Sequence, residues 1–130
     1  MIQRIQTVFF LLISIVSVFV FFFIPPMDFS DSAFPIPFLW KSYLIFTAVF
    51  AFLNLLMFKN RKAQLMINRV HFFIQILVST GLLYCMVNTY DYKTYLPYLL
   101  TPLLVIILLN LSSRAIRKDE DLIRSIDRLR

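Results

Sequence analysis

The strongest constraint on this chain of 130 residues is a set of four long stretches that contain no Asp, Glu, Lys or Arg. A helix needs about 20 apolar residues to cross roughly 30 Å of hydrocarbon. Because lipid offers no hydrogen bonds, the backbone must satisfy its own polar groups, which favours helices. The sequence therefore predicts an all-α fold, a four-helix transmembrane bundle with spans near residues 6–24, 41–58, 70–88 and 95–112.

The composition also indicates that lipid, and not water, surrounds most of the chain. The chain is 60% hydrophobic and 15% charged, whereas soluble domains carry roughly a quarter charged residues. The net charge of +6 would suit nucleic acid, but the basic residues cluster at the ends of the apolar stretches, where they govern membrane topology. We therefore expect the lipid bilayer as the environment and no nucleic acid as a partner.

The basic residues also predict an orientation. Eleven of the 13 precede the first span, separate the second and third, or follow the fourth, and only Lys41 and Lys93 lie in the other connections. With an even number of spans, the positive-inside rule places both termini in the cytoplasm. Trp40 and the six tyrosines lie near the opposite interface, where amphipathic rings are favoured.

Side chains for catalysis or metal binding are scarce. The predicted spans hold no acidic or basic residue away from their ends, His71 is the single histidine, and Cys85 is the single cysteine. Gly81 is the single glycine, so no phosphate-binding loop or nucleophile elbow is available. We expect no enzyme, no catalytic residue, no metal site and no cofactor.

The polar side chains inside the predicted spans are candidates for helix packing. Asn54 lies near the cytoplasmic end of the second span and Gln75 near the matching end of the third, and a short loop makes the two spans antiparallel. Amide side chains in lipid form interhelical hydrogen bonds, so Asn54 is expected to approach Gln75 or His71. His71 and Gln75 also share a polar stripe with Ser79, which favours bundle packing over a path for a small solute.

The last 18 residues, 113–130, form a charged amphipathic segment. No Gly or Pro occurs after Pro102, so the fourth span is expected to continue as a cytoplasmic helical extension, while Pro102 is expected to bend or break the helix. Its apolar face would contact a protein, a second copy of the chain or the membrane surface, unless the segment is an inert cap. The candidate contact residues are Arg114, Arg117, Lys118, Leu122, Ile126 and Leu129.

Three segments, "MIQRIQTVFFLL", "NRKAQL" and "RAIRKDEDLIRSIDRLR", carry a family resemblance. The chain resembles a domain-of-unknown-function family of small four-span inner-membrane proteins from Bacteroidota. The resemblance implies a bacterial inner (cytoplasmic) membrane location. It implies no activity and no site residue.

Together these features favour a non-enzymatic integral inner-membrane protein, a scaffold or accessory subunit of a larger membrane complex. It would contact other membrane proteins or a cytoplasmic protein through the basic loop 59–69 and the tail. The alternative is a small-solute transporter or channel acting as a homo-oligomer. A transporter requires a continuous polar cavity near the middle of the membrane, whereas a scaffold can be packed solid.

Overall fold

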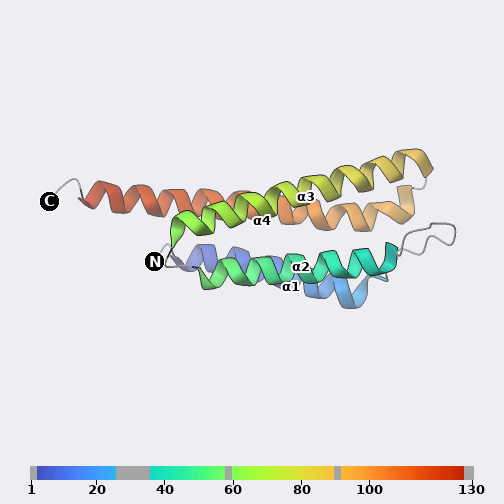
Figure 1. Ribbon diagram of the computed structural model, residues 1–130, viewed down its shortest axis with the longest axis horizontal. Helices are drawn as coiled ribbons and strands as arrows, with labels where there is room; N and C mark the ends of the chain where they lie inside the picture. Colours follow the sequence, from blue (N-terminus) through green and yellow to red (C-terminus); the bar gives the residue numbers. More distant parts are fainter. Residues whose placement is uncertain (1–2, 26–35, 58–59, 90–91, 128–130) are drawn as a thin grey trace.

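The protein is described by a computed structural model that covers residues 3–25, 36–57, 60–89 and 92–127. Within these residues the chain forms four helices and no strand: α1 (Gln3–Phe23), α2 (Ile36–Leu56), α3 (Arg61–Thr89) and α4 (Tyr92–Asp127) (Figure 1). Each helix is long and apolar enough to cross a membrane. The predicted all-α fold with four spans is confirmed, and the chain is a multi-pass membrane protein.

The helices extend beyond the apolar stretches from which the spans were predicted. α3 begins at Arg61, nine residues before the expected start of its span, because Asn60 caps it. The Oδ1 atom of Asn60 accepts a hydrogen bond from the backbone N–H of Ala63 at 3.2 Å. Helices end where their backbone is capped and not where hydrocarbon ends, so charge-free stretches underestimate helix length.

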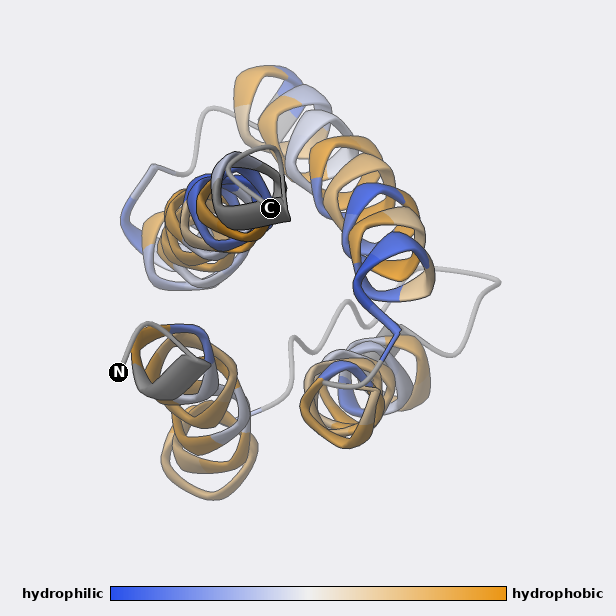
Figure 2. Cartoon of the chain, turned by 90° about the vertical axis from the view of Figure 1, so that its left-hand side faces the viewer, coloured by the Kyte–Doolittle hydropathy of each residue, from blue (hydrophilic) through white to orange (hydrophobic). Residues whose placement is uncertain are grey.

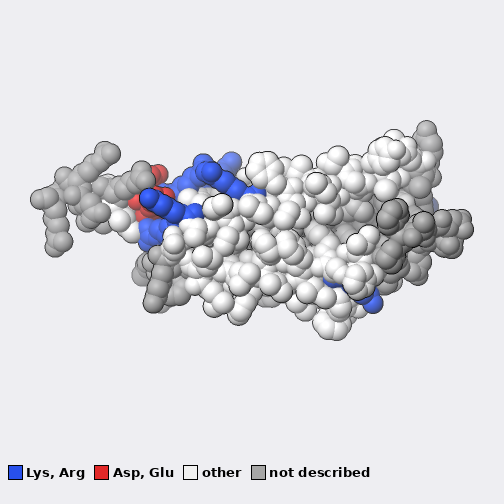
Figure 3. Space-filling model, viewed as in Figure 1, with Lys and Arg blue, Asp and Glu red and all other residues white. Residues whose placement is uncertain are grey.

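The four helices run antiparallel and form a ring in the order of the chain (Figures 1 and 2). α1 packs closely on α2 and on α4, and α3 packs closely on α4, whereas α2 and α3 have few contacts. α1 and α3 begin, and α2 and α4 end, at the same end of the bundle. Lys and Arg side chains gather there (Figure 3), and we call it the basic end.

Two apolar clusters fill the interior. The first lies in the half of the bundle nearer the basic end and consists of Phe10, Ile13, Ala51, Val105, Leu109 and Ile116. The second lies toward the opposite end and consists of Val20, Trp40, Leu44, Tyr95 and Tyr98. Both clusters draw on α1, α2 and α4, so these three helices form the apolar core.

The aromatic residues near the opposite end divide into two groups. Tyr84 and Tyr92 are exposed, as expected for interfacial rings. Trp40, Tyr95 and Tyr98 are instead buried among the helices, with the rings of Trp40 and Tyr98 edge to face at 5.2 Å. The hydroxyl of Tyr98 donates to the carbonyl oxygen of Pro25 at 2.8 Å. A phenol that bonds to the backbone at a helix end no longer needs interfacial water.

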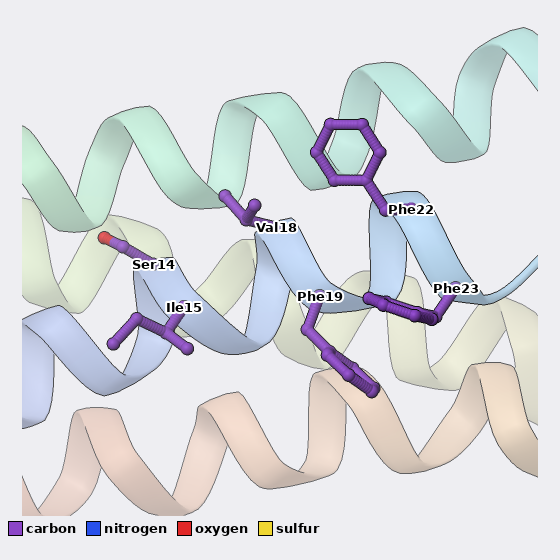
Figure 4. A pocket seen from close by; sticks show the side chains of 6 residues that line it. All are labelled: Ser14, Ile15, Val18, Phe19, Phe22 and Phe23. Atoms are coloured by element: carbon purple, nitrogen blue, oxygen red, sulfur yellow. The ribbon is translucent and has the colours of Figure 1, made fainter.

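The outward surface of α1 is apolar and grooved (Figure 4). A pocket of about 390 Å³ runs along it, and the rings of Phe19 and Phe23 stack at 4.5 Å beside the pocket. Ser14 is its one polar lining residue, and its hydroxyl donates to the Phe10 carbonyl within α1 at 3.1 Å. Such a surface is suited to acyl chains.

α4 is a single uninterrupted helix of 36 residues, although it contains Pro97 and Pro102. Of the bend or break expected at Pro102, the break does not occur. Proline removes one backbone bond, but the side chain of Pro102 is buried against neighbouring helices, which hold the helix together. The membrane segment and the charged segment as far as Asp127 are therefore one continuous element.

The first turns of the charged segment belong to the bundle. Ile116 is completely buried and is part of the first apolar cluster. One turn later the carboxylate of Asp119 forms an ion pair with Arg61 at the start of α3, with 2.7 Å between Oδ2 and Nη2. This pair fixes α4 against α3 at the basic end.

Replacing Asp119 by Asn should loosen α4 beyond the bundle. The two side chains are 20% and 12% exposed, so we expect a cost of about 1–2 kcal/mol, between the values for exposed and buried ion pairs. Amide hydrogen exchange over residues 114–127 would report the loosening. Asp121→Asn, which removes an exposed carboxylate from the same helix, is the control. Equal exchange in both variants would contradict the role of the pair.

Candidate functional site

A stripe of polar side chains runs along one face of α3 and is buried in the bundle. Its members are four, three, four and four residues apart, which is the spacing of one helix face. The stripe consists of Gln64, Asn68, His71, Gln75 and Ser79. His71, Gln75 and Ser79 were expected from the sequence. Gln64 and Asn68 extend the stripe toward the basic end and were missed, because the predicted span began at residue 70.

Gln75 is the centre of the hydrogen bonds between α2 and α3. Its Oε1 atom accepts a hydrogen bond from the hydroxyl of Tyr43, and its Nε2 atom donates to Thr47 Oγ1 at 3.2 Å. Both partners lie on α2, one turn apart, and Thr47 is fully buried. Since α2 and α3 share few other contacts, these bonds are a principal link between the two helices.

The amide of Gln75 also contacts His71 within α3. Gln75 Nε2 lies 3.0 Å from His71 Nε2, which is within hydrogen-bonding distance. The ring is completely buried and lies near two phenyl rings of α2, at 6.5 Å from Phe46 and 5.7 Å from Phe50. His71 is therefore a packed member of the helix interface.

Asn54 is buried as expected but bonds differently from the prediction. Its side chain is completely buried, yet neither amide atom has a hydrogen-bond partner among the described residues. The predicted bond from Asn54 to Gln75 or His71 is therefore absent from the described structure. The backbone carbonyl of Asn54 instead accepts from Gln64 Nε2 at 3.1 Å, because α3 begins early enough to bring Gln64 opposite Asn54.

Asn68 links the stripe to α4. Its Nδ2 atom donates to the carbonyl oxygen of Leu109 at 3.0 Å and to Ser113 Oγ at 2.6 Å. The Oδ1 atom of the same amide is buried and has no partner in the described residues. A buried amide oxygen without a partner is costly, and Asn68 lies on the face of α3 that contacts α4.

The predicted contact residues occupy the end of α4. Arg114, Arg117, Lys118 and Leu122 are all exposed. The helix backbone includes position 126, but the side chain of Ile126 and all of Leu129 lie outside the described residues. Arg69 of α3, which the sequence pattern does not indicate as a contact residue, lies beside Arg114 and Arg117 in a common pocket.

The described residues contain no group of three or more His, Cys, Asp or Glu side chains arranged to hold a metal ion. Cys85 is exposed on α3. The polar interior is therefore made chiefly of amides, hydroxyls and one imidazole. Such groups hold helices together or bind neutral and anionic ligands through hydrogen bonds.

Replacing Gln75 by Leu should destabilise the bundle, since it removes both bonds to α2. Interhelical bonds in membranes contribute about 0.6 kcal/mol on average, so we expect a loss of about 1–2 kcal/mol, including the unpaired Tyr43 hydroxyl. Ser79→Ala is the matched control, because that hydroxyl donates to the Gln75 carbonyl within α3 at 2.8 Å. The free energy of unfolding in mixed micelles measures both. Equal losses would show that Gln75 does not link the helices.

Comparison with known proteins places the chain in a family. No curated protein and no solved structure matches it. The family described as "Domain of unknown function (DUF4293)" matches residues 35–129, which include α2, α3 and α4. This match covers well over half of the chain. The loop and C-terminal segments that carry the resemblance lie almost entirely within the match, whereas the N-terminal segment precedes it. The protein is therefore a member of this uncharacterised domain family.

Proposed function

We propose that this protein is a non-enzymatic scaffold or accessory subunit of a larger complex in the bacterial inner membrane. One observation carries the proposal: the inward face of α4 continues beyond the end of the bundle. Along this face, residues 105, 109, 112, 116 and 119 are buried, whereas the next one, Ile123, is 42% exposed. The other helices cover this face along the membrane-spanning part of α4 and leave it exposed beyond the bundle. The exposed part is therefore suited to binding a partner.

The chemistry of this surface favours a protein partner. Leu122 and Ile123 supply exposed apolar area, and Lys118 adds a basic flank. The exposed carboxylate of Asp121 lies among them and would be repelled by anionic headgroups, which disfavours a tail lying on the membrane. An amphipathic helix with an apolar stripe and acidic flanks complements this surface.

The location and orientation in this proposal rest on charge. The basic end carries Arg61, Lys62 and Arg69 of α3 together with Arg114, Arg117 and Lys118 of α4. The positive-inside rule assigns such an end to the cytoplasm, and the family resemblance supports a bacterial inner membrane. The contact surface at the end of α4 would then face cytoplasmic proteins and the cytoplasmic segments of membrane neighbours.

Ile123→Glu should release a partner that the unaltered protein retains. The change places a charge in the centre of the apolar surface, and burying an unpaired carboxylate in an interface costs several kcal/mol. Tagged protein would be extracted in mild detergent, and its bound partners and oligomeric state compared by quantitative mass spectrometry and light scattering.

Ser125→Glu is the matched control, because it adds the same charge to an exposed position on the same helix. A partner lost only from Ile123→Glu supports the scaffold. If loss of self-association is the single change, the partner is a second copy of the chain. If neither variant alters any association, the proposed contact surface is wrong.

The orientation has its own test in cells. In a Cys85→Ser background, a cysteine at Ser125 should react with a membrane-impermeant maleimide only after the inner membrane is permeabilised. A cysteine at Lys93, at the opposite end of the bundle, should react in intact cells once the reagent has reached the periplasm. The reverse labelling pattern would contradict cytoplasmic termini.

A small-solute transporter or channel is the second candidate. The buried polar stripe of α3 favours it, because polar side chains in membrane helices often mark a solute path. Three pockets lie on α1, between α1 and α2, and between α3 and α4 at the basic end, and Gln75 and Ser79 line none of these three. The scaffold is the first proposal because it rests on the exposed face at the end of α4.

A further inference from the structure

We propose that a groove between α3 and α4 at the basic end binds the phosphoryl headgroup of an anionic phospholipid. The groove has a volume of about 500 Å³ and is lined by three arginines, Arg69 from α3 and Arg114 and Arg117 from α4. The basic patch of Figure 3 lies at this end of the two helices. A scaffold needs no bound lipid, so the inference goes beyond the proposed function and is independent of it.

The charges of the groove are unbalanced. No acidic residue lines it, and none of the three arginines forms an ion pair with a described acidic residue. Three like charges around one groove repel one another, and the repulsion is stronger at the edge of a low-dielectric membrane. A phosphoryl group relieves it and matches the planar donor pairs of guanidinium groups.

Ser113 adds a hydroxyl donor to the lining. A serine in a helix commonly donates to the carbonyl four residues earlier, which here is that of Leu109. That carbonyl already accepts a bond from Asn68 Nδ2 at 3.0 Å, and the same nitrogen lies 2.6 Å from Ser113 Oγ, which accepts. Among the described residues the hydroxyl of Ser113 donates to no acceptor, so its hydrogen is available to an oxygen in the groove.

Asn68 independently indicates a ligand with donor groups. It is 1% exposed, lines the groove, and its Oδ1 atom has no partner among the described residues. Buried amide oxygens are rarely left without a donor. The arginines are suited to binding an anion, and the Oδ1 atom of Asn68 is suited to accepting a hydrogen bond from a hydroxyl or an amine. A phospholipid headgroup such as phosphatidylglycerol carries both, a phosphoryl group and the hydroxyls of the glycerol attached to it.

The apolar side of the groove distinguishes a lipid from free phosphate. Phe72 and Phe73 line it one turn deeper along α3 than Arg69, on the side of the membrane interior. Phe73 is 67% exposed, and Leu77, one further turn along the same face, is 73% exposed. The groove thus presents cations at its outer edge and an open apolar track below them, which fits an acyl chain beneath its headgroup.

Lipid retention by the full chain tests this proposal. The protein would be purified in mild detergent micelles containing phosphatidylglycerol or phosphatidylcholine, and retained lipid would be quantified by native mass spectrometry. We expect clear preference for phosphatidylglycerol, and a loss of affinity of at least about tenfold in Arg69→Gln/Arg114→Gln, since hydrogen bonds to charged groups are strong. Millimolar inorganic phosphate should not displace the lipid.

The matched control is Lys62→Gln/Lys118→Gln, which removes two exposed basic side chains from the same helices outside the groove. Its affinity should fall less than about threefold, because general surface attraction is weak and screened. Equal losses in both double variants would overturn the site. Displacement by inorganic phosphate would identify a free-anion site instead. Equal retention of the two lipids by the unaltered protein would overturn the proposal without any variant.

Discussion

The structure depends on one constraint: a polar side chain in a membrane span needs a hydrogen-bond partner within the protein, because lipid offers none. α3 carries five such residues on one face, from Gln64 to Ser79. Their inward placement determines the rotation of the helix and turns residues such as Phe73 and Leu77 toward lipid. The usual arrangement of apolar core and polar surface is therefore partly reversed in α3.

The same constraint explains how consecutive helices are joined. α1, α2 and α4 meet through apolar clusters that contain Phe10, Val105 and Leu109. α2 and α3 have few contacts, and Gln75 links them through Tyr43 and Thr47 instead. Apolar area gives no driving force between helices in lipid, so a few hydrogen bonds are enough to join two helices that share few contacts.

The sequence predicts some levels of this structure well and others poorly. Four spans follow from charge-free stretches, because a single charge in hydrocarbon is costly. Helix ends do not follow, because Asn60 starts α3 and the neighbouring helices carry α4 through Pro102. The early start of α3 places Gln64 opposite the carbonyl of Asn54, a pairing that the hydropathy pattern does not contain.

The residues of the candidate sites were also predictable from the sequence only in part. Exposed Arg114, Arg117 and Lys118 could be recognised from sequence, since charges follow an apolar span there. The grouping of Arg114 and Arg117 with Arg69 could not, because it joins residues more than 40 positions apart through the contact of α3 with α4. The sequence does contain one indication that α3 begins before residue 70. Gln64 and Asn68 continue the spacing of His71, Gln75 and Ser79 across the predicted start of the span.

The continuity of α4 has a mechanical consequence. A helix of 36 residues is about 54 Å long, well beyond the roughly 30 Å of hydrocarbon. Spanning segments tilt when the thickness of the bilayer changes. With no interruption between the membrane and Asp127, such a tilt is carried along a stiff rod to its far end. Leu122 and Ile123 lie on this helix beyond the bilayer, so they change position whenever the membrane-spanning part of the helix tilts.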